Sequence, residues 1–394
     1  MTPFDFEKER QSIDLSVAQI DHILEPLGLR CVEKCWLKNP AGQWFVNKVF
    51  KISCAPTDAC TSSTYLALKV MHPWWIGQGK TLSEVRCLRL AASKGVPVPK
   101  VISFHVGACA CPFPNDITKR GEWLTTQKKG SGWAYEWMLM DFCLGVSLGE
   151  VWEEMAWAER TVWITKVVTT LVKLKGLQTY PAAGSFADDE GISITSERDF
   201  GRGPFLKWRD ERTEDLREAK TRLQSVQADS RVQEQQIQQL ISVVNEVLQE
   251  LSAPVYGEHP IVFTHRDVAP KNVLIDRTAQ TITALLDWEW SGAGFLEDDI
   301  AEMDYPLTGS DTSNESFTDA RGVPYSEQSE FVLNLWRALL PRQLSTHLKD
   351  YRQRALMSEL CLMIKRRVEE NHTAVNDITQ RWRQFSSQYV NKNS

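Results

Sequence analysis

The sequence predicts an α+β protein with two lobes, a small β-rich N-lobe and a larger, mostly helical C-lobe. Short β-prone runs, bounded by Pro, Gly, Asp and Ser, dominate residues 36–140. From residue 148 onward apolar side chains recur mostly at helical spacing, and 261–290 is a strand-like exception. We therefore expect residues 1–141 to form a leader and a β-rich lobe, and 142–394 to form a helical lobe.

Composition limits the class of protein. The chain has 394 residues, of which 42% are hydrophobic, so it can bury a sizeable core. A net charge of -6 argues against a nucleic-acid partner. No apolar run approaches the about 18 residues of a membrane span, and the opening segment lacks a signal-peptide core. Because no segment could span a membrane, we expect no membrane partner. Nine scattered cysteines are typical of reduced thiols, so we expect a cytoplasmic protein.

The β-rich lobe is predicted to contain three strands and one helix. The strand candidates are 46–52, 65–71 and 133–141. The helix is expected over 82–94, because Thr81 and Glu84 have capping-box spacing and Gly95 can end it.

Four helices are predicted in the second lobe from broad apolar stripes. They are expected over 160–177, 226–252, 326–340 and 351–371. The Gln-rich stretch 233–239 is interpreted as the solvated face of the second of these helices.

The segment 261–290 carries the residues that could take part in catalysis or bind a metal. It contains the pattern H-R-D-x-x-x-x-N, with His265, Arg266, Asp267 and Asn272 at its defined positions.

Two apolar runs, 273–275 and 282–286, follow this pattern and predict a β-hairpin. Antiparallel pairing would set Asn272 opposite Asp287, where facing Cβ atoms lie about 5 Å apart. An amide oxygen and a carboxylate at that distance suit Mg²⁺, and Asp267 could accept a proton from a hydroxyl nearby. The alternative is that Asp267 and Asp287 cap turns and that His265 is a core histidine.

Lys69 is the second candidate. The run from Leu66 to Lys69 has the form of a kinase strand motif, and a mid-strand lysine among apolar neighbours requires an ionic partner. Nucleotide phosphates and Glu84 could supply that partner. Glu84 has an alternative role in the expected capping box with Thr81.

Two further nucleotide-binding positions carry weaker signals. The loop 41–50 contains one glycine, Gly42, where a phosphate-covering loop would be richer in glycine. Asp141 lies in the expected link between the lobes, where backbone groups could bind adenine.

These motifs resemble the aminoglycoside phosphotransferase and choline kinase-like family, in particular its fungal phosphotransferase members. The segments THRDVAPKNVLID and LLDWEWSGAGFLEDDIA carry the resemblance, which extends over roughly residues 36–305. The resemblance implies a two-lobed protein kinase-like fold and transfer of the γ-phosphate of ATP to a small-molecule hydroxyl. By motif, Asp267 is the catalytic base, and Asn272 and Asp287 hold Mg²⁺. Lys69 holds the nucleotide phosphates and Glu84 orients Lys69.

The sequence departs from the protein kinase pattern. Trp288 and Glu289, in place of Phe and Gly, follow Asp287, and no A-P-E segment follows. This favours a small-molecule substrate over a protein. A catalytically silent kinase fold that binds nucleotides or acts as a scaffold is the alternative, and a protein kinase is a third. The oligomeric state stays open.

The acceptor has few sequence signals. An acidic run could attract a cation or could simply be a solvated helix start, and it comprises Glu297, Asp298, Asp299, Glu302 and Asp304. Trp288 and Trp290 could form an aromatic wall, although core packing is the interpretation we favour.

Overall fold

The computed structural model describes residues 13–37, 47–57, 64–71, 79–107, 135–176, 178–188, 194–195, 203–226, 231–253, 256, 259–300 and 325–351, with single positions between 354 and 383. The chain divides into two compact units. The first comprises Met1–Leu174, Ser185–Arg202 and Asp267–Gly292, and the second comprises Lys175–Gly184, Gly203–Arg266 and Ala293–Ser394. The lobe boundary expected at residue 141 lies inside the first unit and stays a prediction.

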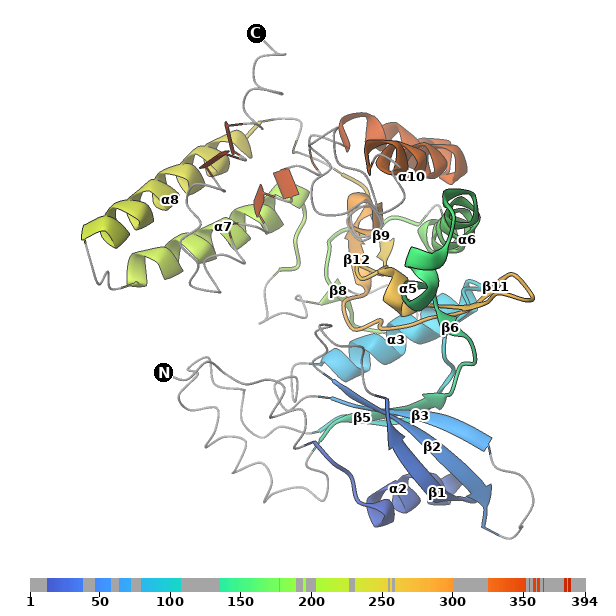
Figure 1. Ribbon diagram of the computed structural model, residues 1–394. Helices are drawn as coiled ribbons and strands as arrows, with labels where there is room; N and C mark the ends of the chain where they lie inside the picture. The colour runs from blue at the N-terminus through green and yellow to red at the C-terminus, as the bar shows by residue number, and fades with distance from the viewer. Residues whose placement is uncertain are drawn as a thin grey trace. The chain divides into compact units, whose positions relative to one another are not determined.

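A five-stranded antiparallel sheet, in the order β1-β2-β3-β5-β4, begins the first unit (Figure 1). Its strands are β1 (Leu29–Trp36), β2 (Lys48–Pro56), β3 (Thr64–Val70), β4 (Val101–His105) and β5 (Trp137–Asp141). The three predicted strands are confirmed as β2, β3 and β5. The prediction missed β1, whose sequence LRCVEKCW has no regular alternation of apolar and polar residues, and β4, which is a five-residue run after two prolines.

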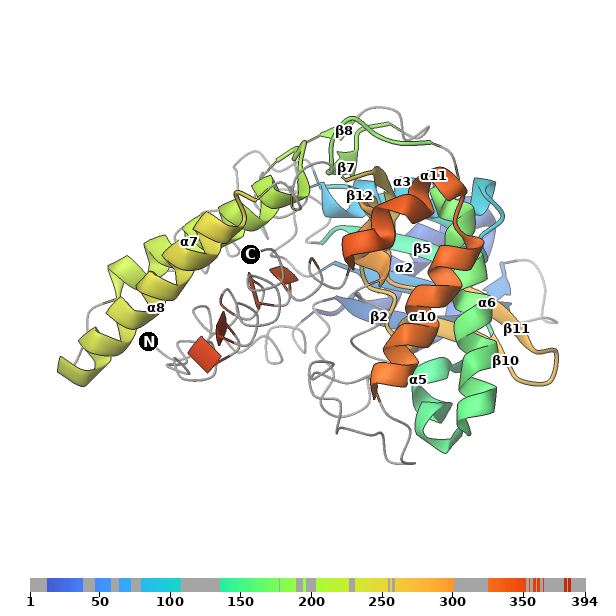
Figure 2. The same cartoon turned by 90° about the horizontal axis from the view of Figure 1, so that it is seen from above.

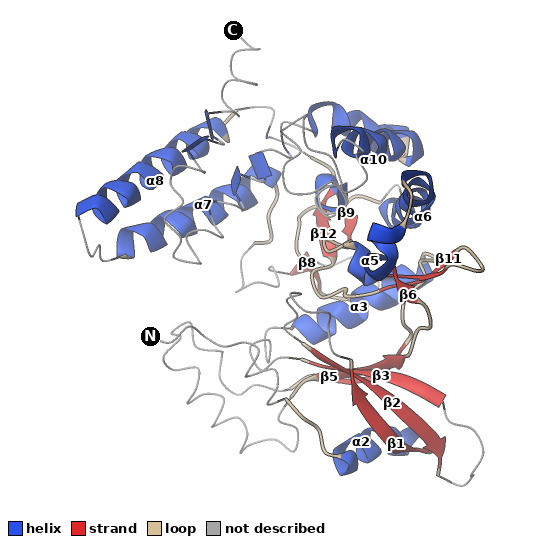
Figure 3. Ribbon diagram, viewed as in Figure 1, coloured by secondary structure: helices blue, strands red, loops and turns tan. Residues whose placement is uncertain are grey.

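The two faces of this sheet differ in chemistry. One face packs with α2 (Val17–Leu24), and its core includes Phe50, Ile52, Leu66 and Leu68. Side chains alternate along a strand, so Lys69 projects to the opposite face. Figures 1 and 3 show α2 and α3 on opposite sides of the sheet. A buried cation is therefore placed where a helix can supply its partner.

Helix α3 (Lys80–Ser93) begins at Gly79, which has a φ of 72° and provides no side-chain cap. The predicted capping box is therefore wrong. The helix begins earlier than the motif implies, so Thr81 lies within its first turn and donates a hydrogen bond to Glu136 over 2.5 Å. The expected end is confirmed at Gly95, whose φ of 72° suits glycine and whose N–H donates to Ala92.

The rest of the first unit carries a second small sheet, with strand order β11-β10-β6. Its remaining elements are β6 (Val146–Ser147), α5 (Leu148–Val151), α6 (Trp157–Lys175), β7 (Ser185–Phe186), β8 (Ile194–Thr195), β10 (Val273–Asp276) and β11 (Thr281–Leu285). Short 3-10 helices are η1 (Glu25–Leu27), η4 (Trp152–Glu154) and η6 (Pro270–Asn272). Helix α6, whose last residue belongs to the second unit, confirms the helix predicted over 160–177.

The described part of the second unit is mostly helical, and its strands β9 and β12 pair with each other. Its elements are α7 (Trp208–Ser225), α8 (Arg231–Glu250), β9 (Ile261–Thr264), β12 (Gly292–Phe295), α10 (Tyr325–Leu339), α11 (Arg342–Ser345) and the 3-10 helix η7 (Thr346–Asp350). Helices α7 and α8 lie side by side (Figure 2). Helices α8 and α10 confirm two predictions, and the described positions within 351–371 are helical.

Helix α7 was not predicted, because charged residues outnumber the few apolar positions, such as Leu216 and Leu223, that it buries. Among the described residues, no helix combines the length and the apolar character needed to cross a bilayer.

Candidate active site

The most concentrated group of charges in the first unit surrounds Lys69 on β3. Its Nζ atom lies 2.9 Å from both carboxylate oxygens of Glu84 and 2.9 Å from Oδ1 of Asp287. A third carboxylate, that of Glu289, lies 3.4 Å away. Lys69 and Glu84 are only 4% and 2% exposed, so the pair is shielded from bulk water. The expected pairing of Lys69 with Glu84 is present in the structure.

The ionisation of this cluster follows from burial and charge. Burial lowers the pKa of Lys69, but the carboxylates of Asp287, Glu84 and Glu289 outweigh it and raise the pKa well above its usual value. Burial raises the pKa of Glu84 in spite of Lys69. Burial and the charge of Asp287 raise the pKa of Glu289 to about 7. Lys69 is therefore a permanent cation held among carboxylates that compete for it.

Glu289 is a member of this cluster that the sequence reasoning noted only as a departure from a motif. Its Oε2 atom accepts a hydrogen bond from the side-chain amide of Asn47, and both residues are buried. Next to it, Lys80 Nζ lies 3.5 Å from the ring centroid of Trp290. Strand alternation could not have identified Glu289, because Asp287 has a left-handed backbone and Glu289 lies in a turn. Its place beside Lys69 follows from tertiary structure.

Asp267 and Asn272 form a second group in the same unit. Asn272 lies at the end of η6 and is 3% exposed. Its Nδ2 atom donates to Oδ2 of Asp267 over 2.8 Å and to the Asp267 carbonyl over 2.9 Å. The amide thus fixes the orientation of a half-buried carboxylate while its own oxygen is directed away from that bond.

The predicted hairpin is confirmed, but its register is not. Strands β10 and β11 pair antiparallel with Val273 opposite Leu285, and a bulge follows at Leu274. At the open end, the Leu286 N–H donates to the Asn272 carbonyl over 2.8 Å. Asn272 therefore faces Leu286 and not Asp287. The ladder closes at Asp276 opposite Thr281, and the one-residue bulge shifts it by a single position, which is not enough to bring Asp287 opposite Asn272.

Asp287 leaves the ladder with a φ of 62°, a left-handed value that is uncommon outside glycine. The structure thus joins Asp287 to Lys69 and Asn272 to Asp267. The alternative in which Asp287 is an ordinary turn cap does not account for its ion pair with a buried lysine.

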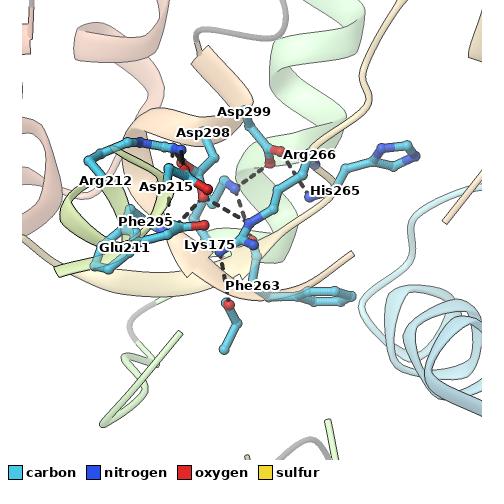
Figure 4. A network of polar contacts seen from close by, with 11 residues as sticks. Lys175, Glu211, Arg212, Asp215, Phe263, His265, Arg266, Phe295, Asp298 and Asp299 are labelled. Carbon is cyan, nitrogen blue, oxygen red and sulfur yellow. Dashed lines mark hydrogen bonds and ion pairs between the residues drawn. The ribbon is translucent and has the colours of Figure 1, made fainter. Parts of the chain in front are cut away.

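The residues before Asp267 belong to the second unit and are anchored there (Figure 4). The N–H groups of His265 and Arg266 both donate to Oδ1 of Asp299, over 2.8 and 2.7 Å. His265 is 1% exposed, as a core histidine would be. Arg266 has a φ of 64°, and its side chain contacts Asp298 at 2.8 Å.

The acidic run begins a helical segment, as expected, but its described members are not solvated. Glu297 and Asp299 are 3% and 0% exposed, and Glu297 pairs with Arg354 at 2.6 Å. Asp298 contacts Arg266 and, at 3.7 Å, Arg212. For these three residues, the acidic run is therefore neither a solvated helix start nor a site that attracts a cationic substrate, and both interpretations are wrong. Glu302 and Asp304 lie outside the described residues.

Trp288 is a core residue, as we favoured. It is 0% exposed, and its Nε1 atom donates to the Leu285 carbonyl over 2.8 Å. Trp290 is half-buried beneath Lys80.

The two weaker nucleotide positions remain predictions. Gly42 lies outside the described residues. Asp141 ends β5, is exposed, and pairs with Leu66. Its N–H donates to the Lys100 carbonyl over 3.0 Å, so the carbonyl side of this segment is better suited to a further hydrogen bond.

The candidate ligands are compatible with a magnesium nucleotide. Within the described ranges, no three His, Cys, Asp or Glu side chains group to hold a metal by themselves. Asp287 and the amide oxygen of Asn272 would be hard oxygen donors, and Mg²⁺ bound with phosphates uses one or two such protein ligands. Lys69 would supply positive charge for phosphate oxygens.

Several solved structures share this fold at low sequence identity. An ADP-bound aminoglycoside phosphotransferase, APH(2'')-Ib, is 11% identical with a TM-score of 0.54, and the match covers 94% of this chain and 98% of that one. An ethanolamine kinase from Plasmodium vivax is 10% identical with a TM-score of 0.53, covering 98% and 95%. A ternary complex of streptomycin, ATP and APH(2")-IIa is 10% identical with a TM-score of 0.52, covering 95% and 99%.

These likenesses establish the α+β kinase-like fold that the sequence predicted. None of the curated protein sequences compared with the chain matches it. The profile of one family, described as the phosphotransferase enzyme family, matches residues 76–353. The match spans more than half of the chain and includes Glu84, Asp267, Asn272 and Asp287. The chain belongs to the phosphotransferase enzyme family.

Proposed function

We propose that the protein is an ATP- and Mg²⁺-dependent O-phosphotransferase that transfers the γ-phosphate to a hydroxyl of a small molecule. The observation that carries this proposal is the contact of Lys69 with Glu84 and Asp287, 2.9 Å in each case, in a unit that also holds the Asp267–Asn272 pair. The proposal includes action in the cytoplasm, the compartment that we expect from the sequence.

In this proposal Lys69 binds nucleotide phosphates, and Glu84 holds its ammonium in place. The geometry supports this because both carboxylate oxygens of Glu84 lie 2.9 Å from the ammonium of Lys69 and so fix its position. Asp287 and Asn272 would hold Mg²⁺, which when bound neutralises charge on the phosphates during transfer.

Asp267 is proposed as the catalytic base. The hydrogen bond from Asn272 orients the carboxylate of Asp267, which would accept the proton of an acceptor hydroxyl. Such positioning, together with charge neutralisation, supplies most of the rate enhancement expected for phosphoryl transfer.

The acceptor is proposed to be a small hydroxyl-bearing molecule. The structural neighbours include a phosphotransferase crystallised with streptomycin and an ethanolamine kinase, so both amino sugars and amino alcohols are reasonable first candidates. A silent nucleotide-binding module is the second candidate function. It is motivated by the single glycine of the 41–50 loop, while the intact ion pair of Lys69 favours an enzyme.

The direct test is a screen of hydroxyl-bearing metabolites for ATP-dependent phosphorylation, with product identified by mass. We expect at least one acceptor to gain a phosphoryl group, and the Lys69→Met variant to lose the activity. Lys100→Met, which removes an exposed lysine of the same unit, is the control and should retain it. Binding of ATP without transfer to any acceptor or to water would favour the silent module. Labelling of peptides would favour a protein kinase.

A further inference from the structure

A fully buried ion pair lies in the second unit, between the last residue of α6 and the acidic run. Lys175 and Asp299 are both 0% exposed at their side chains. The Nζ atom of Lys175 donates to Oδ2 of Asp299 over 2.5 Å and to the Phe263 carbonyl over 2.9 Å. The same ammonium lies 5.8 Å from the ring centroid of Trp336, on α10. Neither charged group is one that the proposed chemistry uses.

The second oxygen of Asp299 holds two consecutive backbone groups. Oδ1 accepts from His265 N–H at 2.8 Å and from Arg266 N–H at 2.7 Å (Figure 4). Consecutive N–H groups seldom point to one acceptor, and here they do so because Arg266 has a φ of 64°. A non-glycine residue in this conformation is strained, so it persists only when neighbouring contacts enforce it.

The side chain of Arg266 is held independently of its backbone. Its Nε atom lies 2.8 Å from Oδ2 of Asp298, and Nη2 donates to the Ala293 carbonyl over 3.3 Å. Gly294 leaves room for this side chain, because a Cβ there would lie 2.4 Å from Arg266 Nε. Two neighbouring aspartates therefore fix Arg266. Asp299 binds the backbone N–H of the arginine, and Asp298 contacts the guanidinium of the arginine.

Stability alone does not explain the pair of Lys175 with Asp299. Desolvation of two charges offsets much of their attraction, and apolar residues of similar volume often stabilise a core equally well. What the ion pair provides is orientation. With Oδ2 bound to Lys175, the carboxylate cannot rotate, so Oδ1 stays directed at the two N–H groups.

We propose that Lys175 is a positioning residue of the phosphotransfer site. By fixing the carboxylate of Asp299, it sets the backbone of His265 and Arg266, and hence the point from which the chain continues into Asp267. This inference rests on the proposed function in one respect, the assignment of Asp267 as the catalytic base.

The test compares Lys175→Met with Lys173→Met. Lys173 lies two residues earlier on α6, is exposed, and donates to the Gly95 carbonyl, so its replacement is a matched control. Turnover is measured as ATP hydrolysis, with water as the acceptor, alongside hydrogen exchange of the peptide that contains residues 265 and 266. We expect Lys175→Met to keep the KM for ATP, to lower kcat about 10- to 100-fold, and to accelerate exchange at these amides. Lys173→Met should match the parent in all three. Parental kcat and parental exchange in folded Lys175→Met would overturn the proposal.

A second variant covers the case in which Lys175→Met does not fold. Lys175→Met combined with Asp299→Asn removes both charges and leaves an amide oxygen for the two N–H groups. We expect the double variant to fold and to bind ATP with parental affinity. Its kcat should still be lowered, because an uncharged amide beside methionine is free to rotate. A parental kcat in this variant would contradict the positioning role.

The two proposals fail in distinguishable ways. If the parental protein neither hydrolyses ATP nor phosphorylates any acceptor, the proposed function fails. Hydrogen exchange then decides the inference alone, since protection of residues 265 and 266 by Lys175 does not depend on turnover. Unchanged exchange in both Lys175 variants would overturn it.

Discussion

Lys69 and Asp287 are 218 residues apart in the chain, yet Nζ of the first lies 2.9 Å from Oδ1 of the second. The contact joins the central strand of the five-stranded sheet to the residue that follows the β10–β11 hairpin. Both belong to the first unit. The left-handed backbone of Asp287 allows the contact, because an extended residue would continue the ladder.

Asp267→Ala should separate binding from chemistry. The carboxylate is half-buried and bonded by Asn272, so its loss removes the proton acceptor without opening the core. We expect the rate of phosphate transfer to fall about 10²- to 10⁴-fold while the affinity for ATP is retained. The control is Asp276→Ala, which removes a carboxylate that bonds Thr278 N–H and Ala279 N–H in the β10–β11 turn. A parental transfer rate in Asp267→Ala would remove this residue from the mechanism.

Glu84→Gln should weaken both the fold and the site. The amide retains the shape of the side chain but replaces the ion pair with a hydrogen bond from the Lys69 ammonium to a neutral amide oxygen. We expect the free energy of unfolding to fall by about 1–3 kcal/mol, measured in urea, and turnover to fall by about 10-fold. Glu33→Gln, on the exposed side of β1, is the matched control and should change neither quantity. Full turnover in Glu84→Gln would show that Lys69 needs no orienting partner.

Glu289 should make stability depend on pH when neither nucleotide nor Mg²⁺ is present. Its pKa is raised from 4.5 to about 7 in the folded protein, by burial and by Asp287, so the folded state binds this proton more tightly than the unfolded chain. The resulting stabilisation is fully present below pH 4.5 and is lost as the pH rises through 7. We expect the unfolding free energy of the parent to decline by roughly 1–3 kcal/mol over this interval relative to Glu289→Gln. Urea unfolding at several pH values measures the difference, and identical slopes for the two proteins would refute the prediction.

Sequence motifs named the candidate site residues but did not predict their contacts. The pattern H-R-D-x-x-x-x-N located Asp267 and Asn272, but it could not show that the amide of one bonds the carboxylate of the other. The register of the hairpin depends on where its turn closes, with Asp276 opposite Thr281, and on a one-residue bulge between Leu274 and Ile275. The residue pattern specifies neither feature, so local sequence reasoning placed Asn272 one residue out of register.

The fold class was predictable because strand and helix periodicities differ along the chain. Helix α7 was not predicted because it buries few apolar residues. The capping box is absent because Thr81 and Glu84 bond Glu136 and Lys69, which are distant in sequence. Glu297, Asp298 and Asp299 were misread for a related reason. Acidic residues are usually solvated, and only the structure shows the cations Arg354, Arg266 and Lys175 that neutralise them.

The most direct test of the account is a calorimetric titration with ATP, with and without Mg²⁺, of the parent and of Asp287→Asn. The substitution retains the size of the side chain and leaves Lys69 paired with Glu84, so the fold should survive. We predict that Mg²⁺ strengthens ATP binding to the parent by at least about 10-fold and gives little gain in the variant. An equal gain in both proteins, or a parent that does not bind ATP at all, would contradict the central claim that Lys69 and Asp287 form a magnesium nucleotide site.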